Sequence, residues 1–321
     1  MSSLASGRYQ PRMWATAMII AVAAFGISRD AGAQQRGRRD YFRESRGSID
    51  TTVAFDHRGT VTLTLNSGDI IVTGWSRDEL RVHATSEGEN LRFDASSSRA
   101  VLDLSGSYRG HGEAKFEVAV PTGVRVIARS QSGDISITGT RGQVEARTQS
   151  GDIKVEDAAD RLDLVTLSGE VETRGLTGDV QIKTVSGDIS AQDVKGDFEA
   201  ESTSGGIELR HAECRYVRAH TTSGDLTYEG SIDGSGRYEF VTHSGDVRLT
   251  IPASSGAQLS VSTWSGSVES DFPMTLKPGD HNIGSGHAKR FTFEIGNAAA
   301  RITAETFSGD ITVSAKGQSG R

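Results

Sequence analysis

A column of carboxylates recurs along much of the chain at a nearly constant spacing, and repeated carboxylates could bind calcium. Each follows a Ser-Gly pair, and the pairs recur in equal steps at Ser132, Ser150, Ser168, Ser186 and Ser204, and in slightly longer steps at Ser223, Ser244 and Ser265. Carboxylate oxygens are the hard ligands that Ca²⁺ prefers. The carboxylates of this series are Asp134, Asp152, Glu170, Asp188, Asp225, Asp246 and Asp310.

The calcium hypothesis takes Asp134, Asp152 and Asp188 as its candidate ligands. Calcium-binding β-roll repeats read G-G-x-G-x-D-x-U-x, whereas here the Asp directly follows a single Gly. Gly206 and Ser267 also interrupt the column. The pattern therefore favours a structural role, in which the Gly permits a positive φ and the Asp bonds to the turn backbone. We predict no cofactor, with calcium as the alternative.

The residue just before each Ser-Gly pair forms a second column, which changes from polar to apolar and aromatic. Its members are Gln131, Gln149, Leu167, Val185, Thr203, Thr222, His243, Trp264 and Phe307. A Thr or Ser precedes each of them and is expected to point inward, so this column is expected to point outward. Exposed aromatic side chains are typical of contact surfaces. His243, Trp264 and Phe307 are therefore candidate binding residues, unless residues 271–300 cover them.

The remaining reactive side chains do not form a recognisable catalytic site. His211, Cys214 and His220 are close in sequence, but no second pair of ligands completes a zinc site at the usual spacing. The sequence contains no nucleophile elbow, phosphate-binding loop or H-E-x-x-H motif. We predict that the protein is not an enzyme, with a carbohydrate-active β-helix enzyme as the remote alternative.

Short strands must position these columns. After each Ser-Gly pair apolar residues alternate with polar ones, as in Ile135-Ser136-Ile137, and a second alternating segment follows half a repeat later. Alternation with period two predicts strands with one buried face. One repeat cannot bury its apolar face alone, so the repeats must stack. We predict an all-β, parallel β-helix-like solenoid with about 18–21 residues per coil.

The chain divides into five predicted regions. Residues 129–316 form the repetitive solenoid, in which 271–300 are an enlarged, irregular coil before the last repeat. Residues 48–128, which contain an outlying copy at Ser67-Gly68-Asp69, form irregular coils or a β-rich N-terminal cap. Residues 1–33 resemble a signal peptide, 34–47 a flexible basic leader, and 317–321 a tail.

The N-terminus predicts export. Arg8 and Arg12 precede an apolar run, and an A-x-A site predicts cleavage between Ala33 and Gln34. We expect a periplasmic or extracellular protein that is not integral to the membrane after cleavage. The net charge of −7 argues against nucleic acid as a partner.

The serial T-x-S-G-D-[IVL] units, the exported N-terminus and Val120-Pro121-Thr122-Gly123 resemble the bacterial DUF4097 family of β-strand-repeat, adhesin-like proteins. The resemblance covers residues 48–316 and implies the fold, but carries over no catalytic residue. It implies an adhesin-like, non-catalytic binding module of the cell envelope, whose partner is a glycan or a protein. The alternative is a structural or self-assembling envelope protein without a ligand.

Overall fold

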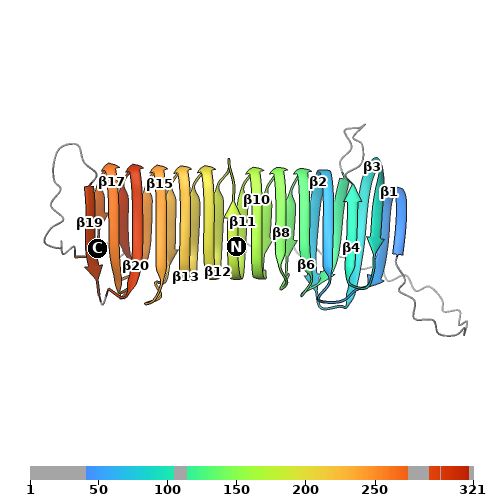
Figure 1. Ribbon diagram of the computed structural model, residues 1–321, viewed down its shortest axis with the longest axis horizontal. Coiled ribbons are helices and arrows are strands. Elements are labelled where there is room, and N and C mark those ends of the chain that lie inside the picture. The colour runs from blue at the N-terminus through green and yellow to red at the C-terminus, as the bar shows by residue number, and fades with distance from the viewer. Residues whose placement is uncertain (1–40, 105–113, 274–288, 297, 318–321) are drawn as a thin grey trace, which may run out of the picture. The chain divides into compact units, whose positions relative to one another are not determined.

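The computed structural model describes residues 41–104, 114–273, 289–296 and 298–317. Within these residues the chain forms β-strands and no helix (Figure 1), which confirms the all-β solenoid. None of the described segments forms a helix that could cross a membrane. The strands are β1 (Tyr41–Ala54), β2 (Thr60–Trp75), β3 (Glu79–Ala95), β4 (Arg99–Leu104), β5 (Ala114–Pro121), β6 (Arg125–Ser132), β7 (Ile135–Thr138), β8 (Val144–Ser150), β9 (Ile153–Glu156), β10 (Ala159–Ser168), β11 (Val171–Lys183), β12 (Ile189–Ser204), β13 (Ile207–Ser223), β14 (Leu226–Gly230), β15 (Arg237–Ser244), β16 (Val247–Pro252), β17 (Ala257–Ser265), β18 (Val268–Ser270), β19 (Lys289–Ile295), β20 (Ala300–Ser308) and β21 (Ile311–Lys316).

Successive coils stack in parallel and in register. β8 pairs with β6 and β10, while β9 pairs with β7 and β11. The inward positions of both strands in a coil are apolar, so residues such as Val144 and Ile153 are fully buried between the two stacks. The alternation seen in the sequence is therefore the burial pattern of the strands.

The outlying N-terminal copy joins the same stack. Ser67 pairs with Ser132 and Ile70 with Ile135, although three other strands separate β2 from β6 along the chain. These strands are β3, β4 and β5, and β3 runs antiparallel to the other two. The antiparallel strands cover the end of the parallel stack, as the N-terminal cap was predicted to do.

The strand β1 corrects one predicted boundary. Residues 41–47 belong to this strand rather than to a flexible leader, because Tyr41 pairs with Ala95 in an antiparallel ladder with β3. Charged side chains are common on edge strands and mask the strand pattern in the sequence. Residues 34–40 lie outside the described part of the chain.

The last repeat does not stack where its place in the sequence suggests. β20 inserts between β15 and β17, with Ser308 paired to both Ser244 and Ser265. β19 then pairs antiparallel with β17 on the side away from β20. The predicted irregular coil at 271–300 therefore includes a reversing strand. Residues 274–288 and 297 of this segment lie outside the described residues.

Candidate binding surface

The glycines of the Ser-Gly-Asp motif bring neighbouring turns into close contact. Gly187 has a φ of 149°, and a Cβ on it would lie 1.9 Å from the carbonyl oxygen of Gly169 in the preceding coil. The same close approach recurs at Gly151 and Gly205. A side chain cannot fit at these positions without separating the coils, so the Gly meets both a conformational and a steric requirement.

Each of the three calcium candidates accepts a backbone hydrogen bond from the next coil. The amide of Asp152 donates to Asp134 Oδ1 over 2.9 Å, and that of Glu170 donates to Asp152 Oδ1 over 2.8 Å. Gly206 donates to Asp188 Oδ1 over 2.7 Å. The predicted Asp-to-backbone bond therefore exists, but it links two coils rather than closing its own turn. In the described residues, no group of three or more His, Cys, Asp or Glu is placed to hold a metal ion.

An arginine offsets the charge of the carboxylate column toward its C-terminal end. Arg248 donates to Asp225 Oδ2 over 2.8 Å and to Asp246 Oδ2 over 2.7 Å. The hydrogen bond from Arg248, with a second from the amide of Asp246, lowers the pKa of the Asp225 carboxyl below its ordinary value. A side chain of the protein thus supplies the positive charge between these two carboxylates.

The hydroxyls that precede the second column point inward, as predicted. Thr166 is buried and donates to the carbonyl oxygen of Gly151 over 3.1 Å, and Thr306 donates to that of Gly245 over 3.0 Å. Because successive residues of a strand point to opposite faces, the next residue must point outward.

The three candidate binding residues form one stacked ladder of rings. Phe307 lies between the other two because β20 inserts between β15 and β17. Its ring centroid is 4.8 Å from that of His243 and 5.8 Å from that of Trp264, with interplanar angles of 13° and 9°. Trp264 and Phe307 remain 48% and 47% exposed, and residues 274–288 and 297 of the segment expected to cover them lie outside the described residues.

We call the whole second column the outer row. In spatial order its members are Gln131, Gln149, Leu167, Val185, Thr203, Thr222, His243, Phe307 and Trp264, and all are exposed. Leu167 and Val185, at 51% and 45% exposed, occupy neighbouring coils. Both were visible in the column but were not chosen as candidates, because single exposed aliphatic residues are ordinary. Only the register shows that they share a line with the aromatic ladder.

The His and Cys residues that are close in sequence do not form one site. Cys214 is buried, and burial raises the pKa of its thiol to about 12, so the thiol stays neutral. His211 lies on the outside, with Nδ1 3.3 Å from Asp193 Oδ1, and His220 Nε2 lies 2.9 Å from Glu239 Oε1. Each imidazole has its own acidic neighbour, and the thiol faces the core.

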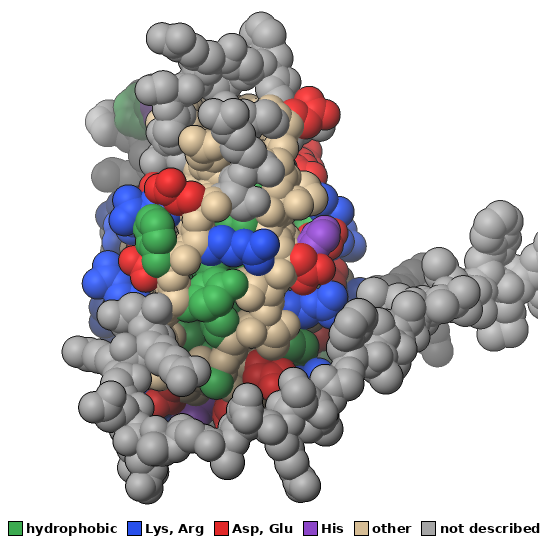
Figure 2. Space-filling view, turned by 90° about the vertical axis from the view of Figure 1, so that its right-hand side faces the viewer, with side chains coloured by type: hydrophobic (Ala, Val, Ile, Leu, Met, Phe, Trp, Pro, Cys, Tyr) green, Lys and Arg blue, Asp and Glu red, His purple; other side chains and the backbone are tan. Residues whose placement is uncertain are grey.

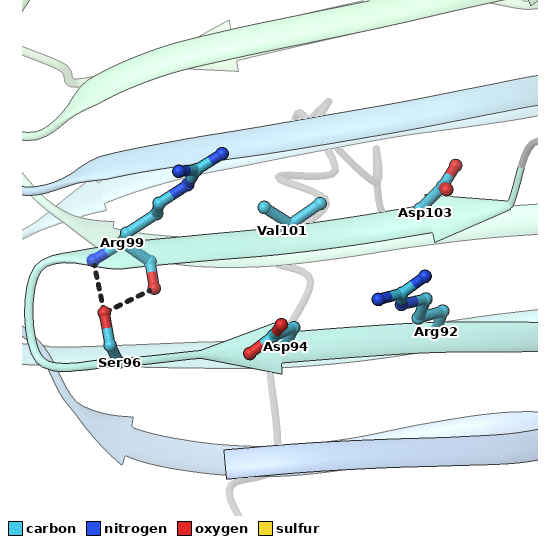
Figure 3. A pocket seen from close by; sticks show the side chains of 6 residues that line it. All are labelled: Arg92, Asp94, Ser96, Arg99, Val101 and Asp103. Atoms are coloured by element: carbon cyan, nitrogen blue, oxygen red, sulfur yellow. Dashed lines mark hydrogen bonds between the residues drawn. The ribbon is translucent and has the colours of Figure 1, made fainter. Parts of the chain in front are cut away.

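A polar hollow of about 540 Å³ lies on the N-terminal cap (Figure 3). It is lined by Arg92, Asp94, Ser96, Arg99, Val101 and Asp103. Ser96 accepts from the amide of Arg99 and donates to its carbonyl, each over 3.1 Å, which closes the turn between β3 and β4. The end of the solenoid near β1 shows basic, acidic and hydrophobic side chains side by side (Figure 2). Neither feature presents a field of one charge.

Comparison with known families agrees with the strand pattern. The family model described as Toastrack DUF4097 matches residues 54–314. A comparison with curated proteins finds no match. Among solved structures, the chain is similar to a "putative adhesin" from Bacteroides fragilis NCTC 9343, with 12% identity, a TM-score of 0.38, and coverage of 84% of this chain and 98% of that one. It is also similar to a "putative cell adhesion protein" from Clostridium sporogenes ATCC 15579, with 8% identity, a TM-score of 0.19, and coverage of 87% and 100%.

Proposed function

The chain belongs to the Toastrack DUF4097 family, and from that premise we propose that it is an exported, non-catalytic, adhesin-like binding module of the cell envelope. The leader at residues 1–33, cleaved near Ala33-Gln34, would deliver it to the periplasm or the outside of the cell. Its role would be to hold a partner through the outer row.

The observation that carries this proposal is the gathering of exposed apolar side chains in one line. Of the six large hydrophobic side chains that are exposed in the described residues, Leu167, Val185, Phe307 and Trp264 lie in the outer row. Exposed apolar groups that gather rather than scatter mark interaction sites. The remaining two, Tyr41 and Phe42, lie on β1.

The chemistry of the described side chains supports a non-catalytic role. The Cys214 thiol is neutral and buried, and the column carboxylates Asp134, Asp152 and Asp188 are engaged with the backbone of neighbouring coils. A nucleophile with a base within hydrogen-bonding reach is what an acyl- or glycosyl-transfer site would need. The aspartates of the motif instead connect one coil to the next.

The proposal is tested by measuring adhesion of the purified protein to glycan arrays and to immobilised cell-envelope preparations, with Trp264→Ala and Phe307→Ala beside the wild type. We expect binding to fall at least tenfold in both variants while their melting temperatures stay within about 2 °C of the wild type, because the two rings are half exposed. Binding that is indifferent to both substitutions would contradict the assignment to the outer row. Failure of the wild type to bind any surface, including one coated with the same protein, would favour the structural alternative.

A further inference from the structure

The members of the outer row, which we call its rungs, repeat with the spacing of neighbouring strands in a β-sheet. The serines that directly follow the row are in register from Ser132 through Ser150 and Ser168 to Ser244, Ser308 and Ser265. Neighbouring strands of a sheet lie about 4.8 Å apart. A partner that contacts every rung must repeat with the same rise, and a second solenoid of the same kind does so.

The orientation of the rings favours protein side chains over a sugar. Both faces of Phe307 are covered, one by His243 and the other by Trp264. A pyranose ring stacks on the face of an aromatic ring, and the middle rung offers only its edge. Ring edges and the ends of Leu167 and Val185 bury apolar surface when they pack against other apolar side chains.

The two flanks of the outer row carry opposite charges in three of its four N-terminal coils; in the coil of Leu167, Val165 takes the basic position. Two residues before the row stand basic side chains, each about half exposed although paired to an acid of its own chain: Arg129, Arg147 and Lys183. Three residues after the row, on the other side of the turn, stand exposed acids: Asp134, Asp152 and Asp188. In these coils the uncharged side chains of the outer row therefore lie between a basic edge and an acidic edge.

Symmetry decides how two such surfaces fit together. A two-fold axis parallel to the solenoid brings each coil against the same coil of the other copy and exchanges the flanks, so that Arg147 of one copy faces Asp152 of the other. A two-fold axis across the solenoid would instead place the acidic edge against the acidic edge. Opposite charges across an interface select the first arrangement.

We propose that the partner of the outer row is a second copy of this chain, packed side by side and parallel, with like coils facing each other. This inference rests on the proposed function, since it names the partner of the same surface, and it makes the adhesion homotypic. Leu167 and Val185 then pack against their own counterparts, as does the aromatic ladder.

Sedimentation velocity of the purified protein tests the association. We expect a concentration-dependent dimer whose dissociation constant rises at least tenfold in the double variant Leu167→Ser/Phe307→Ser and also rises in 1 M salt. Phe42→Ser is the matched control, because it removes a ring that is 59% exposed but lies outside the row, on β1. A monomer at all concentrations, or a dimer equally weakened by the control, would overturn the proposal.

Charge variants test the exchange of flanks. Arg147→Glu/Lys183→Glu should weaken self-association by placing acid against acid. The second variant, Asp152→Asn/Asp188→Asn, makes the acidic edge neutral and retains the oxygen that accepts the next coil's amide. In a mixed dimer of the two variants, the introduced Glu residues face the introduced Asn residues, and this pairing is neutral. The unchanged acids of the Glu variant face the unchanged basic residues of the Asn variant, and this pairing stays attractive. We therefore expect the mixed dimer to outnumber the dimer of the Glu variant. No preference for the mixed dimer would contradict the facing of basic and acidic edges.

A thiol crosslink tests the parallel arrangement. Gln149→Cys should link to its own counterpart through a short bismaleimide, because like coils face each other, while the native Cys214 is buried. In an antiparallel dimer centred on the row, the two introduced thiols would lie on the order of 30 Å apart. A dimer without this crosslink would overturn the arrangement. A monomer that binds a glycan through the row would overturn homotypic association but leave the proposed function intact.

Discussion

Phe307 stacks on His243 with ring centroids 4.8 Å apart, although the next repeat after His243 in the sequence carries Trp264. The contact exists because β20 inserts between β15 and β17. The stacking of Phe307 on His243 therefore follows from the order of the strands in space, which differs from their order in the chain. It also turns three separate aromatic residues into one continuous ladder.

Substitution of a motif glycine should destabilise the whole stack. Gly187→Ala places a Cβ 1.9 Å from the carbonyl oxygen of Gly169 and requires a φ of 149° from an L side chain. Backbone strain and overpacking together should cost about 2–4 kcal/mol of the free energy of unfolding. Urea unfolding followed by circular dichroism measures this loss.

The matched control is Gly234→Ala, because a Cβ at that exposed glycine meets no atom within 4 Å. It should change the free energy of unfolding by less than about 0.5 kcal/mol. Equal effects of the two substitutions would mean that the close approach between the turns does not limit stability.

The pair between Asp225 and Arg248 should make stability depend on acid pH. The pKa of Asp225 in the folded protein lies below its ordinary value of 3.8, chiefly because Arg248 donates to it. A depressed carboxyl pKa contributes stability that is present above the ordinary value and lost as the pH falls through the folded value. Both side chains are about half exposed, so the contribution should be about 0.2–1 kcal/mol.

Asp225→Asn should remove this part of the pH dependence, which lies below about pH 4, while keeping an oxygen for the amide of Asp246. Arg248→Met should remove the same part, and the double variant should lose little more. Thermal unfolding across the pH range measures all four proteins. Additive losses in the double variant would show that the two side chains act independently.

The sequence predicts the fold well because every level of the repeat agrees. The alternation requires a strand with one buried face, the motif glycine requires a tight turn, and the inward Thr belongs to the buried face. The structure has all three, as at Val171, Gly169 and Thr166. The first residues of β1, 41–47, were missed because they are rich in charge, with Arg43, Glu44 and Arg46, and because they pair with the far end of β3, as Tyr41 does with Ala95. No local pattern in the sequence specifies such a distant pairing.

The order of the last coils could not be read from the sequence for a physical reason. Ser244, Ser265 and Ser308 stand in nearly identical motifs, so any two of these strands could pair in the same register. The reversal through β19 brings β20 back between its predecessors, and neighbouring residues do not encode that path. The sequence therefore identified His243, Phe307 and Trp264 as candidates, but it did not predict that Phe307 stacks between the other two rings.

Calcium should not stabilise the protein. Asp134, Asp152 and Asp188 each use one carboxylate oxygen to accept an amide from the next coil, and a cation would have to compete for the same groups. We expect the melting temperature to change by less than about 2 °C on addition of EDTA or of calcium, as measured by differential scanning fluorimetry. A larger increase with calcium that disappears in Asp152→Asn would instead establish a cation site in the column.

Removal of the last two strands should damage the solenoid from within. A chain ending at Ala299 lacks β20 and β21, and so removes the parallel neighbour of both β15 and β17. It also loses the buried side chains of Ile302, Ile311 and Val313, which should cost at least about 3 kcal/mol of the free energy of unfolding. A chain ending at Lys316, which retains every described strand, is the control and should unfold as the wild type does. Urea unfolding compares the two. If the shorter chain kept the stability of the control, β17 would have to take the place of β20 beside β15. That outcome would mean that the insertion of β20 between them is not needed for stability.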